Sequence, residues 1–288
     1  MNDSVNRRTF AVMLLAAAPA GLLGQAPESP GTAGRKLDFR IGDDFKASEA
    51  DIIAVLRSAG ESIWQYCPNT RWEVPGFFIF HSTESPITAF DHRADGRIAI
   101  GLTSQGNLWS QFAYQFSHEF CHALAGHAND WKKTWTKGRK ANHWLEESLC
   151  ETASLFAMRA MGQSWKTKPP YPNWKSYSDA LTKYAEDRIV KSAEGFQAGT
   201  KFTDWFKANE AAMREKSTLR EKNNVIALQL LPLFEAEPSG WEAVTFFNLT
   251  KREPENTLAG HLAEWSAAAP PSQRPFIAKL AAVFGVNL

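Results

Sequence analysis

Alternation of apolar and polar side chains predicts a small β-sheet in the first third of the chain. Residues 37–41 alternate apolar with charged side chains, and residues 76–81 form a run rich in aromatic residues. Two further runs, 87–92 and 97–102, flank Asp95-Gly96, a dipeptide typical of the tight turns that join antiparallel strands. We therefore expect four strands, the last two of which form a hairpin.

Apolar residues recur at helical spacing in the rest of the chain. Ile52, Leu56 and Ile63 predict one helix between the first two strands. The later part of the chain shows helical spacing only, over residues 109–125, 143–161, 177–194, 217–231, 239–250, 257–267 and 273–284. A small sheet with helices, followed by a helical half, is an α+β fold. We expect an N-terminal α+β subdomain over residues 37–126 and a helical subdomain over residues 127–288.

The first 26 residues have the features of an export signal. Arg7-Arg8-Thr9-Phe10 precedes a run without charged side chains that extends to Glu28 and is rich in Ala, Gly and Pro. This combination resembles the twin-arginine export signal, and small residues suit cleavage after Ala26. Residues 27–36 then form a linker rich in Pro, Gly and Ser. We expect a periplasmic or extracellular protein; the alternative is an N-terminal anchor that stays in a membrane.

Composition and charge exclude several classes of function. The 288 residues are 44% hydrophobic, which is ordinary for a globular protein, and they include 32 basic and 31 acidic side chains. The chain therefore lacks the basic excess that usually accompanies nucleic-acid binding. No segment after residue 26 is long and apolar enough to span a bilayer, so we expect no stable membrane insertion once the signal is removed. The sequence contains no signal for an oligomeric state.

Residues 118–122, His-Glu-Phe-Cys-His, carry the strongest chemical signal in the chain. Side chains four residues apart point the same way in a helix, so His118 and His122 can offer two ring nitrogens to one Zn²⁺. Glu119 lies roughly 100° further round the helix. From there its carboxylate can take a proton from water and pass it to a leaving amine. Large apolar residues occupy the adjoining face of the same helix, at Phe112, Phe116, Phe120 and Leu124.

A catalytic zinc ion usually needs three protein ligands and an open position for water. The next predicted helix offers the third ligand. Glu146 and Glu147 both lie in its first turn, and spacing alone does not choose between them. Four residues after Glu147 comes Glu151, a carboxylate able to orient a zinc-bound histidine, whereas four residues after Glu146 comes Cys150. This difference favours Glu147 as the third ligand and Glu151 as the orienting carboxylate.

The cysteines, Cys67, Cys121 and Cys150, are odd in number, so one disulfide at most can form. Cys121 and Cys150 each lie beside a candidate metal-site residue, on helices that we expect to face each other. A disulfide between these two and a set of three buried thiols both remain open.

Together the two motifs resemble those of the gluzincin zinc metallopeptidases, a group that includes the thermolysin-like and aminopeptidase families. The second motif, Trp144 to Glu151, is similar to the group's Trp-Leu-Asn-Glu-Gly segment, in which the glutamate binds zinc. The resemblance implies a zincin-like fold and hydrolysis of a peptide or protein substrate. The roles it implies are zinc ligands His118, His122 and Glu147, general base Glu119 and orienting carboxylate Glu151.

The chain also departs from the family pattern. Glu146 and Ser148 replace the usual Asn and Gly, and no aminopeptidase-type motif precedes the zinc helix, which leaves a metalloendopeptidase as the expected class. In the family a strand bordering the cleft pairs with the substrate backbone, and residues 97–102 would be that strand here. In these families a downstream Tyr or His stabilises the oxyanion. No motif locates this residue here, and the candidates are Tyr171, Tyr177, Tyr184 and His261.

Three alternatives stay open. Gly126 and His127 superficially resemble the metzincin tail, but each falls one residue out of its required position. Residues 131–140 hold five basic residues and two Trp, and are either a flap over the cleft or a solvated loop. The rival functions are a non-catalytic, zinc-stabilised binding protein and a zinc amidase that acts on cell-wall material.

Overall fold

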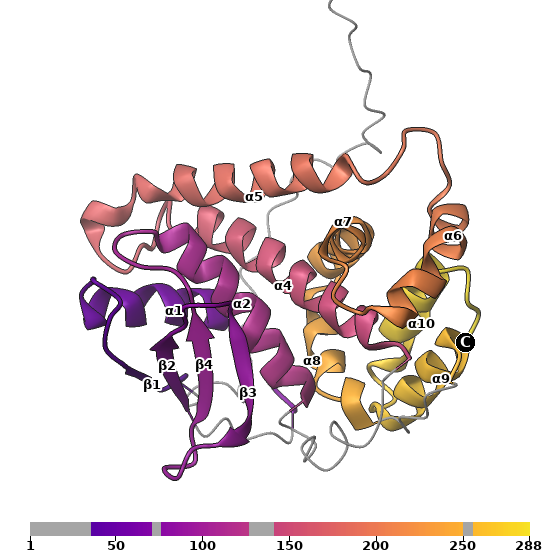
Figure 1. The fold of residues 1–288 in the computed structure, drawn as a ribbon, viewed down its shortest axis with the longest axis horizontal. Coiled ribbons are helices and arrows are strands. Elements are labelled where there is room, and N and C mark those ends of the chain that lie inside the picture. Colours follow the sequence, from indigo (N-terminus) through magenta and orange to yellow (C-terminus); the bar gives the residue numbers. More distant parts are fainter. Residues whose placement is uncertain (1–35, 71–75, 127–140, 250–255) are drawn as a thin grey trace, which may run out of the picture.

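The computed structural model describes residues 36–70, 76–126, 141–249 and 256–288. Its fold is α+β, as the sequence predicts: a four-stranded sheet lies at one side, and helices make up the rest of the described chain (Figure 1). The signal segment expected over residues 1–26 lies outside the described residues. Among the helices that are described, none is both long and apolar enough to cross a membrane.

The sheet has the strand order β1-β2-β4-β3. Its strands are β1 (Phe39–Ile41), β2 (Phe77–His81), β3 (Ile87–His92) and β4 (Ile98–Leu102). The first three in this order are parallel, whereas β3 pairs antiparallel with β4, which confirms the predicted hairpin. Since β4 pairs with a strand on each side, residues 97–102 cannot also pair with a substrate, and that expectation is wrong. The edge strand of the described sheet next to β4 is β3.

One face of the sheet forms a core with α1 (Glu49–Trp64) and α2 (Trp109–Gly126). Side chains alternate between the two faces of a strand, and Phe77 and Ile79 on the inner face are fully buried. From α2, the Phe116 ring packs within 5.5–5.8 Å of the rings of Phe39, Phe77 and Phe120. The predicted apolar face of this helix is therefore buried, which leaves its polar face to point the other way.

The helix α4 (His143–Ser164) occupies the centre of the described structure. It packs against α1, α2, α5 (Tyr177–Ala193) and α7 (Arg220–Ala236). The other helices in the described ranges are α6 (Phe202–Glu215), α8 (Trp241–Val244), α9 (Leu258–Ala268) and α10 (Arg274–Val283). Short 3₁₀ turns are formed by Pro172–Trp174, Pro238–Gly240 and Phe247–Leu249.

Two predictions in the helical half are wrong. Residues 239–250 do not form one helix: α8 has four residues, and 3₁₀ turns flank it. Every residue from 240 to 248 is buried, so the local pattern lacks the polar face of an ordinary surface helix. The helix α6 was not predicted, although Phe202, Trp205, Phe206 and Met213 recur at helical spacing; only Phe206 and Met213 are buried along its length.

Phe116→Ala should lower the free energy of unfolding by about 3–5 kcal/mol, because it removes a fully buried ring that three other rings contact. Urea unfolding followed by tryptophan fluorescence measures this loss. Val190 is 67% exposed, and Val190→Ala, as the control, should change stability by less than about 0.5 kcal/mol. Equal effects of the two substitutions would contradict the packing described for α2.

Candidate metal centre

Two stripes of polar side chains face each other where α2 packs against α4. In both helices the stripe residues are four apart, so each stripe follows one face of its helix. The stripe on α2 is Tyr114, His118 and His122, and the stripe on α4 is His143, Glu147 and Glu151. The helices run in opposite directions, since Tyr114 contacts Glu151 and His122 contacts Glu147.

Glu147 lies between the two histidines of α2. Its Oε2 atom is 3.5 Å from Nε2 of His118, and its Oε1 atom is 3.7 Å from Nε2 of His122. Ligand atoms in a tetrahedral zinc site with ordinary bond lengths lie roughly 3.3–3.6 Å apart. Burial would raise the pKa of Glu147, but the adjacent imidazoles of His122 and His118 lower it to about 2. The carboxylate that the sequence favoured is thus ionised and faces both ring nitrogens.

Glu146 contacts the other nitrogen of His122. This carboxylate is fully buried, and its Oε1 atom is 2.9 Å from Nδ1 of His122. Its Oε2 atom accepts a 3.1 Å hydrogen bond from the side-chain amide of Asn248. The sequence offered Glu146 only as the alternative third ligand, since the packing that brings α4 beside His122 is not visible in the sequence. Asn248, some hundred residues further along the chain, carried no sequence signal at all.

Glu151 takes the corresponding place beside His118. Its Oε1 atom lies 3.7 Å from Nδ1 of His118 and 3.2 Å from Nε of Arg220. The hydroxyl of Tyr114 donates a hydrogen bond to the other oxygen of Glu151, and burial together with this carboxylate holds the pKa of Tyr114 well above its usual range. Both histidines of α2 therefore have Glu147 near Nε2 and a second carboxylate near Nδ1.

These carboxylates make the histidines strongly basic in the metal-free chain. Burial by itself would lower the pKa of His118, but the hydrogen bond with Glu147 and the charges of Glu151 and Glu119 raise it to about 9. For His122, too, burial acts to lower the pKa, and the charges of Glu147 and Glu146 raise it to about 9. The site is built to hold positive charge, as protons or as a cation.

Glu119 is held by the edge strand of the sheet. On β3, Thr88 lies opposite Ile100 of β4, so both side chains point to the inner face, toward α2. The Thr88 hydroxyl lies 2.8 Å from Oε2 of Glu119 and 2.9 Å from its backbone oxygen. Glu119 is 4% exposed, and its charge raises the pKa of His118. The predicted base is therefore next to the histidines and fixed by a buried contact that the sequence did not reveal.

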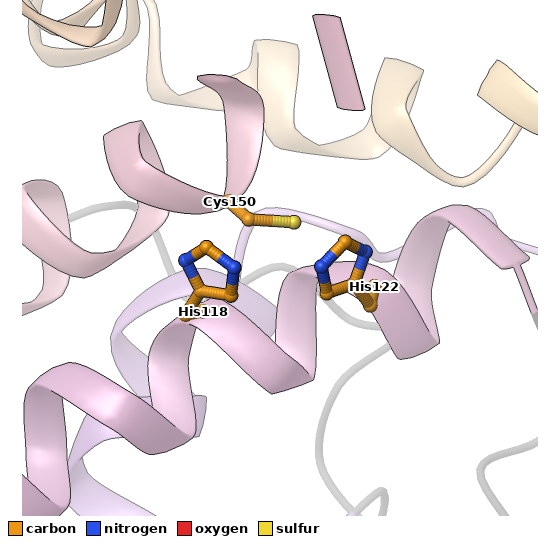
Figure 2. A group of neighbouring side chains, drawn as sticks. All are labelled: His118, His122 and Cys150. Carbon is orange, nitrogen blue, oxygen red and sulfur yellow. The ribbon is translucent and has the colours of Figure 1, made fainter. Parts of the chain in front are cut away.

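Cys150 lies across from both histidine rings (Figure 2). Ligand atoms of Cys150, His118 and His122 lie within 4.8 Å of one another, which makes this a group that could hold a metal ion. The structure has three free, buried cysteines and no disulfide between Cys121 and Cys150. Burial, a hydrogen bond with Cys121 and the nearby carboxylates raise the pKa of Cys150 well above its usual range. Glu147 is ionised and has its two oxygens 3.5 and 3.7 Å from the Nε2 atoms of His118 and His122, so we take it as the third donor.

His143, at the start of α4, belongs to a second group with metal-binding geometry. Ligand atoms of His122, His143 and Glu147 lie within 4.8 Å of one another. The Nε2 atom of His143 is 3.5 Å from Oε1 of Glu147, and its Nδ1 atom is 2.9 Å from the hydroxyl of Ser217. Sequence reasoning missed this residue, although its position four residues before Glu147 on one helix is a signal that could have found it.

The described contacts of the candidates for an oxyanion-binding residue are with residues other than His118, His122 and Glu147. Tyr171 packs against Trp174, and the hydroxyl of Tyr177 lies at hydrogen-bond distance from Ser110. Tyr184 packs on the ring of Tyr114 and accepts a hydrogen bond from Arg188, and His261 packs on Phe247. His127 and residues 131–140 lie outside the described residues.

Comparisons with known proteins add no relative: no family model, curated protein or solved structure matches this chain. The chemistry of the centre is therefore argued from its own residues.

The metal-free protein should lose stability as the pH rises from 6.5 to about 9. His118 and His122 have an ordinary pKa of 6.5 and a folded-state pKa of about 9, so their contribution is complete below pH 6.5 and lost as the pH passes 9. Glu147, whose pKa falls from 4.5 to about 2, contributes above pH 4.5 and loses its contribution as the pH falls toward 2. Urea unfolding in the presence of a chelator, repeated across this pH range, measures the decline. His118→Asn should reduce the alkaline slope, and an unchanged slope would contradict the assignment.

Glu146→Gln should weaken the binding of Zn²⁺, used as a probe, by about 10- to 100-fold, the usual effect of losing a carboxylate that orients a ligating histidine. Glu147→Gln should weaken it further, because it removes a charged donor. Competition with a chromophoric chelator measures each affinity. Cys150→Ser is the comparison variant and should change the affinity less than Glu147→Gln, since Glu147 is taken as the third donor. A larger loss for Cys150→Ser than for Glu147→Gln would reverse the choice of third donor.

Proposed function

We propose that this chain is an exported zinc-dependent peptidase in which Glu119 acts as the general base. The observation that carries the proposal is the position of Glu147, with its two oxygens 3.5 and 3.7 Å from the Nε2 atoms of His118 and His122. Glu119 lies on the same helix, between these two histidines in the sequence. Export rests on the amino-terminal motif alone.

The residues of the centre fit zinc. Two imidazole nitrogens and one carboxylate form a donor set that catalytic zinc sites use. Each histidine of α2 has a carboxylate near its Nδ1 atom, Glu151 for His118 and Glu146 for His122, and such contacts fix the ring and increase its basicity. The ionised state of Glu147 supports its role as a charged ligand.

Glu119 would move the proton in the reaction. Zinc, when bound at such a site, lowers the pKa of water and polarises the carbonyl group of the substrate. The Glu119 carboxylate takes a proton from the water that attacks the peptide carbonyl carbon. It then delivers this proton to the departing amine nitrogen as the carbon–nitrogen bond breaks, which leaves a carboxylic acid and an amine. The contact with the Thr88 hydroxyl restricts the directions in which the carboxylate can point.

Strand β3 borders the candidate base. It pairs antiparallel with β4, and the hydroxyl of Thr88 contacts the carboxylate and the backbone oxygen of Glu119. A substrate that lies along this strand would therefore lie next to Glu119.

Glu119→Gln should retain zinc and lower kcat for peptide hydrolysis by at least about 100-fold, because the amide cannot accept the proton from water. A peptide library with mass-spectrometric detection, run with and without a chelator, measures the activity, and elemental analysis measures the zinc. Glu186→Gln, at an exposed position on α5, is the control and should keep full activity.

Undiminished hydrolysis by a zinc-loaded Glu119→Gln protein would contradict the mechanism. A wild-type chain that binds zinc, unfolds when the zinc is removed and hydrolyses no peptide would instead favour the non-catalytic, zinc-stabilised protein.

A further inference from the structure

The two helices of the centre each present a pair of potential donors with the same spacing. On α2 the pair is His118 and His122, and on α4 it is His143 and Glu147. A separation of four residues brings both members of each pair onto one face of their helix. Since α2 and α4 are antiparallel, the two pairs face each other, and His143 lies beside His122 and Glu147.

The distances from Glu147 do not distinguish His143 from the predicted ligands His118 and His122. From Oε1 of Glu147, Nε2 of His143 is 3.5 Å away and Nε2 of His122 is 3.7 Å away. Donor atoms of these three residues lie within 4.8 Å of one another, and the rings of His122 and His143 are 6.4 Å apart between centroids. By distance, His143 is as well placed to share a cation with Glu147 as either histidine of the HExxH motif.

The surroundings of His143 also resemble those of a ligand. Its side chain is 14% exposed, close to the 13% of His122 and the 16% of His118. Ser217 lies 2.9 Å from Nδ1, so the ring is held by one nitrogen while the other faces Glu147. Contacts of this kind to the outer nitrogen orient ligating histidines in metal sites.

We propose that His143 is a fourth protein ligand of the cation that His118, His122 and Glu147 hold. The inference rests on the metal site of the proposed function and adds a residue that the HExxH and Glu motifs do not contain. Four protein donors complete a tetrahedral zinc site in the absence of substrate. For the attacking water to bind the cation, His143 would have to move aside or the coordination number would have to rise to five.

X-ray absorption at the zinc edge tests this directly, because scattering from imidazole rings counts the histidines bound to the metal. The full-length wild-type protein loaded with one equivalent of zinc should show three histidines, and His143→Ala should show two. Chelator competition should give a loss of zinc affinity for His143→Ala beyond the roughly 100-fold limit of outer contacts. Ser217→Ala should stay within that limit, and Glu186→Gln, at an exposed position on α5, should leave the zinc affinity unchanged.

Cobalt substitution gives a second readout that does not depend on activity. The visible spectrum of the Co²⁺ protein should change shape in His143→Ala and keep its shape in Glu186→Gln. Circular dichroism identifies a misfolded variant, and the histidine count of the wild-type protein needs no variant at all.

Two bound histidines in the wild-type protein, with peptide hydrolysis intact, would overturn the role of His143 and leave the proposed function standing. Three bound histidines without hydrolysis of any peptide would support the fourth ligand and count against the peptidase. A wild-type chain that binds no zinc would overturn both.

Discussion

The antiparallel contact between α2 and α4 is the constraint on which the candidate centre depends. Neither helix holds the site by itself, because His118 and His122 lie on α2 whereas Glu147 lies on α4. The side chains that are spaced four residues apart on each helix form a compact cluster only when the two helix faces oppose each other. The aromatic packing of α2 against the sheet, centred on Phe116, turns the polar face of the helix toward α4.

The charge of the cluster explains why its residues occur together. Glu119, Glu146 and Glu151 are each less than 5% exposed, and Glu147 lies among them. Buried carboxylates are costly unless positive charge compensates them. In the metal-free chain, protonated histidines and Arg220 supply that charge. A divalent cation would replace the protons of the histidines. Metal binding and a change in pH therefore affect the same contacts between the histidines and the carboxylates.

The sheet contacts the centre through the edge strand β3. In β3 the alternation of side chains directs the Thr88 hydroxyl inward to Glu119, while the backbone of the strand borders the same region. A hydrogen bond therefore connects the candidate base to this strand. A substrate that lies along the strand would lie next to the base.

The sequence by itself determined the α+β class, the hairpin, most of the helices and the residues with metal-binding chemistry. These features depend on periodicity and on spacing within one helix, which are local properties. Only the tertiary structure decided that β3 is the edge strand, that Glu146 and Asn248 meet at His122, and that His143 joins Glu147. The physical reason is that a side chain's partners across a helix–helix or sheet–helix interface are set by packing direction. No spacing along the chain encodes that direction.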